Sequence, residues 1–185
     1  MWIQARRWHT DEREPDSKPQ HMEIEVMKAI ASVEGNHKCV RLYHYTTDRS
    51  TFSYRLYMSY HTRGDLSFFT SDQSGYKGPT KIPEPAMWKW FEDLTEACLL
   101  MSKGAEPKSD AKDGWKKIVH CDLKSQNIFL DNPDAKLWKS YPQAMMGDFG
   151  IAVFTDEDDP FNPTWYNAPG GKWTSMYACK SSLTS

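Results

Sequence analysis

The 185-residue sequence predicts an α+β fold, and three patterns lead to that prediction. Apolar residues recur at helical spacing in 20–33 and 84–103, whereas 39–46 and 52–60 are rich in Tyr, Leu and Val with partial alternation. Short apolar runs bracket polar loops further on, at 118–119, 128–130 and 144–146. Helices and hairpin strands in separate parts of one chain are typical of the α+β class.

The composition is that of a globular protein. Hydrophobic residues make up 39% of the chain and aromatic residues 14%, which a disordered chain does not show. A single domain of this length would bury roughly 70% of its unfolded surface. The formal charge of −2 gives no reason to expect nucleic acid or an acidic membrane as a partner.

Cysteine usage and the lack of long apolar runs predict a cytoplasmic or nuclear protein. The four cysteines are far apart and form no Cys-x-x-Cys pair, which argues against a zinc site or a disulfide framework. No apolar run approaches the length needed to cross a membrane, and the N-terminus lacks a signal-peptide pattern.

The first elements follow from periodicity and punctuation. Residues 5–20 are crowded with charge and contain two prolines, so a solvated loop is expected there. Apolar residues at steps of four, four and three predict a helix over 20–33, which Gly35–Asn36 would stop. The runs 39–46 and 52–60 predict a β-hairpin with a polar turn around Asp48–Ser50, and 62–83 is expected to be mostly irregular.

A second, longer helix is predicted over 84–103. Pro83 and Pro85 suit its start and Gly104 its end. Its apolar residues fall on one stripe, the face expected to pack on the core, namely Met87, Phe91, Leu94, Cys98 and Met101. The polar stretches 104–114 and 132–143 are predicted to be exposed insertions.

Residues 118–130 and the tetrapeptide Gly147-Asp148-Phe149-Gly150 carry the chemistry. Their polar residues have an order and spacing that suit phosphoryl transfer, which needs positioned magnesium, neutralised phosphate charge and an oriented hydroxyl. The carboxylate of Asp122 can accept or aim a hydroxyl proton, and Lys124 lies close enough to reach the same phosphoryl group. Asn127 and Asp148 offer the oxygen ligands that magnesium prefers. The flanking glycines would let the backbone turn Asp148 toward the metal.

These residues resemble the protein kinase family. His120 through Asn127 looks like the catalytic loop, and Asp148-Phe149-Gly150 looks like the magnesium-binding motif. The resemblance implies ATP and Mg²⁺ as cofactors and a protein substrate, with Asp122 as catalytic base, Lys124 as phosphate partner, and Asn127 and Asp148 as metal ligands. Lysine two residues after the aspartate resembles the serine/threonine branch. The alternative is that these are ordinary polar loop residues.

The segment Leu56–Leu66 resembles the hinge between the two lobes of that family. The resemblance implies that Met58 is the gatekeeper, that the backbone of Ser59, Tyr60 and His61 faces adenine, and that Asp65 approaches the ribose. The alternative reading is that Met58 and Tyr60 are simply residues of the hairpin.

The family also pairs a helix glutamate with a strand lysine. Glu23 shares a helical face with Met27 and Ile30, whereas Glu25 shares its face with the more polar Lys28. Glu23 is therefore the predicted counterpart, and the alternative is that either glutamate is a solvated surface residue.

The resemblance covers about 20–155 and implies a partial two-lobe fold, truncated at both ends. Residues 1–61 would form an incomplete small lobe, with a helix plus β-hairpin, and 62–185 the first part of the helical large lobe. The sequence has no Gly-x-Gly-x-x-Gly and no clear strand lysine, although Arg6 or Arg7 could be a remnant near that strand. No glutamate follows Ala168-Pro169, and Cys121 replaces the arginine usually beside the catalytic aspartate.

Two functions from different classes remain open at this point. One is a kinase that phosphorylates serine or threonine hydroxyls of a protein, supported by the four residues of the two motifs. The other is an inactive kinase fragment or pseudokinase that acts as a binding module, supported by the missing elements. The sequence does not predict an oligomeric state.

Overall fold

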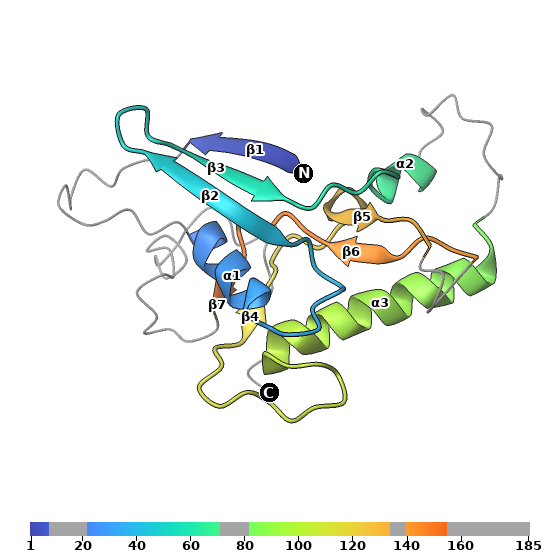
Figure 1. Ribbon diagram of the computed structural model, residues 1–185. Helices are drawn as coiled ribbons and strands as arrows, with labels where there is room; N and C mark the ends of the chain where they lie inside the picture. The colour runs from blue at the N-terminus through green and yellow to red at the C-terminus, as the bar shows by residue number, and fades with distance from the viewer. Residues whose placement is uncertain (8–21, 71–81, 134–139, 155–185) are drawn as a thin grey trace, which may run out of the picture.

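The computed structural model describes residues 1–7, 22–70, 82–133 and 140–154, and it confirms the α+β class (Figure 1). A three-stranded sheet lies at one side of the molecule and the long helix α3 (Glu84–Lys103) at the other. The short hairpin of β5 (Ile128–Leu130) and β6 (Ala144–Met146) lies between them.

The three-stranded sheet has the order β1-β3-β2 and is antiparallel throughout. The predicted hairpin is confirmed as β2 (Leu42–Asp48) and β3 (Ser53–Met58). The expectation of a loop from residue 5 is wrong for its first residues, because β1 (Trp2–Arg7) is a strand. It pairs with β3 from Trp2↔Met58 to Arg7↔Ser53. This pairing satisfies the hydrogen-bonding groups of the β1 backbone, which would otherwise bond to water. Composition alone does not reveal such a pairing.

Helix α1 (Met22–Ala31) confirms the first predicted helix, with ends two residues inside the predicted ones. Its Val26, Met27 and Ile30 are buried. On β3, the alternate residues Tyr54, Leu56 and Met58 are buried in the same core cluster. Period-two alternation on a strand and a 3.6-residue period on a helix thus meet in one apolar layer.

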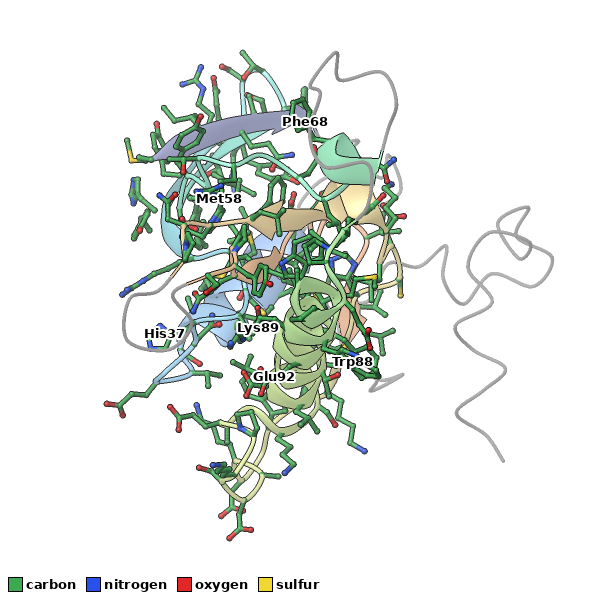
Figure 2. The ribbon with its side chains drawn as sticks, turned by 90° about the vertical axis from the view of Figure 1, so that its right-hand side faces the viewer. His37, Met58, Phe68, Trp88, Lys89 and Glu92 are labelled. Atoms are coloured by element: carbon green, nitrogen blue, oxygen red, sulfur yellow. The ribbon has the colours of Figure 1, made fainter. Side chains whose placement is uncertain are left out.

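Helix α3 has the predicted bounds. The predicted buried stripe is right for Met101, which is buried, and for Leu94, which packs partly buried against the core, but it is wrong for the other three residues. Met87, Phe91 and Cys98 are exposed. The buried face passes instead through Ala86, Lys89, Trp90, Asp93, Ala97, Leu100 and Met101. Two of these residues, Lys89 and Asp93, are charged and bond to each other. A prediction based on apolar residues alone therefore selected the neighbouring stripe. Figure 2 shows Lys89 and Trp88 projecting from different sides of α3.

Three short strands were predicted correctly, and each borders a polar loop. Strand β4 (Ile118–Val119) pairs with β7 (Val153–Phe154), and β5 pairs with β6. The single-turn helix α2 (Ser67–Thr70) and the 3₁₀ turn η2 (Ser125–Asn127) complete the described elements. The β4–β7 and β5–β6 pairs hold the ends of the loops that carry Asp122 and Asp148.

The main core cluster contains residues from both sides of the predicted boundary at 61/62. Ile30 and Leu56 come from the first segment and Met101 and Phe149 from the second. The division into 1–61 and 62–185 therefore stays a prediction, as does the two-lobe arrangement. Among the described residues, no helix combines the length and the apolar character that crossing a membrane requires.

Gly104 gives a first testable prediction. It ends α3 at φ +67°, donates its N–H to the carbonyl of Leu100, and an added Cβ would lie 2.1 Å from the Trp115 ring. Gly104→Ala is therefore expected to lower the free energy of unfolding by about 1–2 kcal/mol for the left-handed backbone and by about 1–3 kcal/mol more for the clash. Chemical denaturation measures the change. Gly114→Ala is the matched control, because Gly114 has φ +69° with open space around it.

Candidate functional site

The loop between β4 and β5 has an unusual backbone conformation just before Asp122. Cys121 has φ +62°, a left-handed conformation that is uncommon for a residue with a side chain. The Cys121 Sγ lies 3.6 Å from the carbonyl oxygen of Val119. Such conformations cluster at functional sites, where surrounding structure holds them in place.

Asp122 is held by two neighbours from its own loop. Lys124 Nζ donates to Asp122 Oδ2 at 2.6 Å, and Asn127 Nδ2 donates to the same oxygen at 3.0 Å and to the Asp122 carbonyl at 2.9 Å. Burial alone would raise the pKa of Asp122, but the bonds from Lys124 and Asn127 outweigh it and hold the pKa below its usual value. Asp122 is therefore ionised at neutral pH.

Asp148 follows β6 and is half-buried. The sequence suggested that glycines beside it would supply the unusual backbone, but the positive φ, +57°, belongs to Asp148 itself. Aspartate tolerates this conformation better than most residues. Gly147 is needed for space instead, since a Cβ there would lie 2.6 Å from Val40 and 2.8 Å from Phe129. Close packing of Gly147 thus sets the position from which Asp148 projects.

The two loops meet through Asn127 and His120. The pairing of Ile128 with Met146 brings Asn127 opposite Gly147, whose N–H donates to the Asn127 carbonyl at 2.9 Å. His120 Nε2 contacts the Gly147 carbonyl at 2.9 Å, and its Nδ1 accepts the Asp122 N–H at 3.3 Å. A continuous set of hydrogen bonds therefore runs from Asp122 to the residue before Asp148.

His120 has the structural role that its position suggests. It is buried, and its ring lies 5.0 Å from the Phe149 ring. Desolvation lowers its pKa, although the charges of Asp148 and Asp122 both act in the opposite direction. Both carboxylates therefore act on one imidazole, which is expected if the two aspartates border one site.

The donor set of this site fits magnesium in its chemistry. Asn127 Nδ2 donates hydrogen bonds to Asp122, so the other amide atom, Oδ1, is the hard oxygen that remains for a metal. Asp148 adds a carboxylate. No cluster of three His, Cys, Asp or Glu side chains suited to a metal ion occurs in the part of the chain that the structure describes. Magnesium keeps several waters and uses substrate phosphates, so two protein ligands are a sufficient set.

The residues predicted to face adenine lie at the end of β3. Met58 is buried and Tyr60 is exposed. Ser59 donates its N–H to the Arg41 carbonyl at 2.9 Å, so only its carbonyl remains for a base. His61 is buried, and its carbonyl accepts the N–H of Gly64 at 3.3 Å.

Asp65, predicted to approach a ribose, has a second role. Its Oδ1 accepts hydrogen bonds from the N–H groups of Ser67 and Phe68, at 2.9 and 3.3 Å, and from the Ser67 hydroxyl. This is the pattern of a helix N-cap, here for α2. A ribose would therefore have to use the other carboxylate oxygen.

The structure separates the two glutamates of α1. Glu23 is buried and its Oε2 accepts the Tyr54 hydroxyl at 2.6 Å, whereas Glu25 is bonded to exposed Lys28 at 3.0 Å. Glu23 therefore lies on the face toward apolar surroundings, as the helical spacing indicated. Tyr54 was missed, although its alternation with Leu56 and Met58 places it on the buried face and a buried hydroxyl needs an acceptor.

Tyr54→Phe tests how strongly this bond stabilises α1. The change removes a donor from a buried carboxylate, and hydrogen bonds to charged groups contribute about 1.5–3 kcal/mol. We expect a loss of that size in the free energy of unfolding, measured by urea denaturation. Tyr57→Phe on the opposite face of β3 is the control and should change little. Equal losses in both variants would contradict the prediction.

A buried charge cluster on α3 was also missed. Asp93 is fully buried and accepts hydrogen bonds from the ammonium groups of Lys38 and Lys89 and, at 3.0 Å, from the N–H of Ala144. Asp93 thus joins α3 to β6 and to the segment before β2. The sequence signal was the i, i+4 spacing of Lys89 and Asp93.

The chain is distantly similar to known serine/threonine kinases. Serine/threonine-protein kinase Nek2 of Mus musculus is 28% identical over 142 residues, which cover 77% of this chain and 28% of that protein. The protein of the same name from Homo sapiens is 28% identical over 130 residues, covering 70% of this chain and 25% of that protein. No family model matches the chain. The chain thus spans little more than a quarter of these relatives, and the similarity supports a kinase-like relationship.

Proposed function

We propose that this chain is a kinase-like domain that binds Mg-ATP and transfers the terminal phosphoryl group to a serine or threonine hydroxyl of a protein. The distant similarity to kinases supports the reaction class. The observation that carries the proposal is the hydrogen-bonded set of Asp122, Lys124 and Asn127, joined through Gly147 to Asp148.

Each residue of the set has a distinct task in this reaction. Asp122, ionised by its neighbours, orients the attacking hydroxyl and accepts its proton as the new oxygen–phosphorus bond forms. Lys124 neutralises charge on the transferred group while the bond to the diphosphate leaving group breaks. Asn127 and Asp148 would hold magnesium, which would supply positive charge to offset that of the phosphates.

The residues around this set are proposed to bind the nucleoside. The backbone of Ser59, Tyr60 and His61 faces adenine behind Met58, and Asp65 approaches the ribose. Glu23, on α1, is proposed to orient the residues that bind the phosphates.

A second candidate is a binding module without catalysis. The sequence observation that favours it is the cysteine at position 121. Such a chain could retain nucleotide binding while transferring no phosphate.

Two measurements decide between these candidates. Mg-ATP at millimolar concentration is expected to raise the melting temperature, because a ligand at 100 times its Kd stabilises the folded state by about 2.7 kcal/mol. Transfer of the γ-phosphate to serine and threonine peptides then identifies catalysis. Binding without transfer favours the binding module. The absence of any rise in melting temperature contradicts the nucleotide site.

A further inference from the structure

A chain of polar contacts runs through the side chains at the end of β3. The backbone N–H of Arg41, just before β2, donates to Ser59 Oγ at 3.1 Å. Ser59 Oγ lies 2.9 Å from His61 Nε2, and His61 Nδ1 lies 3.4 Å from Asp131 Oδ2, just after β5. The last contact is long for a hydrogen bond.

The donors and acceptors along this chain have one consistent arrangement. The hydroxyl of Ser59 accepts from Arg41, so its own proton is available for Nε2 of His61. His61 then carries its proton on Nδ1, facing the carboxylate of Asp131. In this arrangement the imidazole is neutral, and its Nδ1 proton faces Asp131 across a distance that is long for a hydrogen bond.

The neighbouring backbone ties the same two parts of the fold together. Leu130 donates its N–H to the Gly64 carbonyl at 2.8 Å, and Leu66 donates to the Ile128 carbonyl at 2.8 Å. The His61 ring is buried and stacks on Phe129 with ring centroids 6.0 Å apart. His61 therefore sits where the three-stranded sheet joins the β5–β6 hairpin.

We propose that His61 is a positioning residue for purine recognition. Held between Ser59 and Asp131, its imidazole fixes the backbone of residues 59–61, whose peptide groups would bind the base. This inference rests on the proposed function. There, residues 59–61 would touch the base only through their backbone, whereas the inference concerns the side chains of Ser59 and His61. Ser59 and Asp131 act through His61.

The arrangement also makes recognition of the base depend on pH. Desolvation favours neutral His61, while the charge of Asp131 works against that effect, and the pKa of His61 remains below its usual value. The other groups around the ring, the Ser59 hydroxyl and the Phe129 ring, are uncharged. Protonation would place a second proton on Nε2 and leave the Ser59 hydroxyl proton without its acceptor. The backbone of 59–61 is therefore expected to loosen as the pH falls through the lowered pKa of His61.

The test separates recognition of the base from recognition of the phosphates. Dissociation constants are measured for Mg-ATP and for magnesium tripolyphosphate, which has no base, between pH 5 and pH 8. His61→Phe keeps a ring against Phe129 and removes both polar contacts. We expect it to weaken Mg-ATP binding about tenfold at neutral pH, as the loss of one or two hydrogen bonds implies, and to leave tripolyphosphate binding within about twofold.

Two further variants make the result decisive. Ser59→Ala breaks the same chain with a smaller change, and it should shift the ratio of the two constants in the same direction even if His61→Phe fails to fold. His44→Phe, at an exposed histidine on β2, is the matched control and should leave the ratio unchanged. The ATP preference of the unmodified protein should decline as the pH falls, and that of His61→Phe should not.

The possible failures point to different parts of the argument. If the unmodified protein binds both ligands and both hinge variants keep its ratio of constants, the positioning role of His61 is overturned and the proposed function stands. If the unmodified protein binds neither ligand, the proposed function itself is overturned, together with this inference.

Discussion

Replacing Asp148 with asparagine is expected to abolish the magnesium-dependent part of nucleotide binding. Asparagine keeps the size of the side chain and also tolerates the left-handed backbone at φ +57°, so the change removes charge with little effect on the loop. With the carboxylate gone, the proposed metal site retains only neutral amide oxygens and no negative charge. Where phosphoryl transfer is measurable, the rate should fall by about 10²–10³ or more, as for other losses of a preorganised charge-stabilising group.

The measurement is the shift in melting temperature caused by ATP with and without magnesium. Asp113→Asn, in the exposed loop after α3, is the isosteric control and should retain the full shift. A magnesium-dependent shift that survives in Asp148→Asn would show that another residue holds the metal.

The largest loss of stability is expected from Asp93→Ala. The carboxylate is fully buried and neutralises two lysines. Removing one partner of a buried ionic network leaves uncompensated charge and costs about 3–5 kcal/mol. Because domains are stable by only about 5–15 kcal/mol, this single change should bring the protein close to unfolding.

Urea denaturation of Asp93→Ala and Glu92→Ala tests this prediction. Glu92 contacts the same Lys89 at 3.3 Å, but its side chain is 61% exposed, and exposed ion pairs contribute about 0–1 kcal/mol. Glu92→Ala should therefore be nearly neutral. Similar midpoints for the two variants would mean that the buried network does not stabilise the fold.

The pH range of this stabilisation follows from Lys38. Burial would lower its pKa, but the hydrogen bonds and charges of Asp93 and Glu96 outweigh burial, so its pKa is raised. A lysine with a raised pKa stabilises the folded state at every pH below its unfolded value of about 10.4 and loses that contribution as the pH rises through the folded value. The Lys38 contribution should therefore be constant through neutral pH.

Local sequence signals were enough for the elements and the loops of the candidate site. The hydrophobic period, with prolines before and a glycine after, placed α3 at its observed bounds, and the turn residues placed the β2–β3 hairpin. The motif around Asp122 and Asp148 was also readable, because its residues are close together in the chain. Each of these features depends on neighbours within a few residues.

Contacts between segments that are distant in the sequence could not be predicted from these local signals. The buried face of α3 includes Lys89 and Asp93. Asp93 bonds there to the ammonium of Lys38 and to the N–H of Ala144, which are both distant from it in the sequence. Strand β1 exists as part of a sheet only because β3 offers it an edge. The close packing of Gly147 against Val40 and Phe129, next to Asp148, likewise joins segments that are distant in the sequence.

By itself, then, the amino-acid sequence determined the two main helices, the β2–β3 hairpin and three of the short strands, and which polar residues carry the proposed chemistry. Only the tertiary structure decided which charged groups are buried and how the two loops are joined. The physical reason is that period and turn chemistry act over a few residues along the chain. Burial of charge and close packing depend instead on partners that folding brings together.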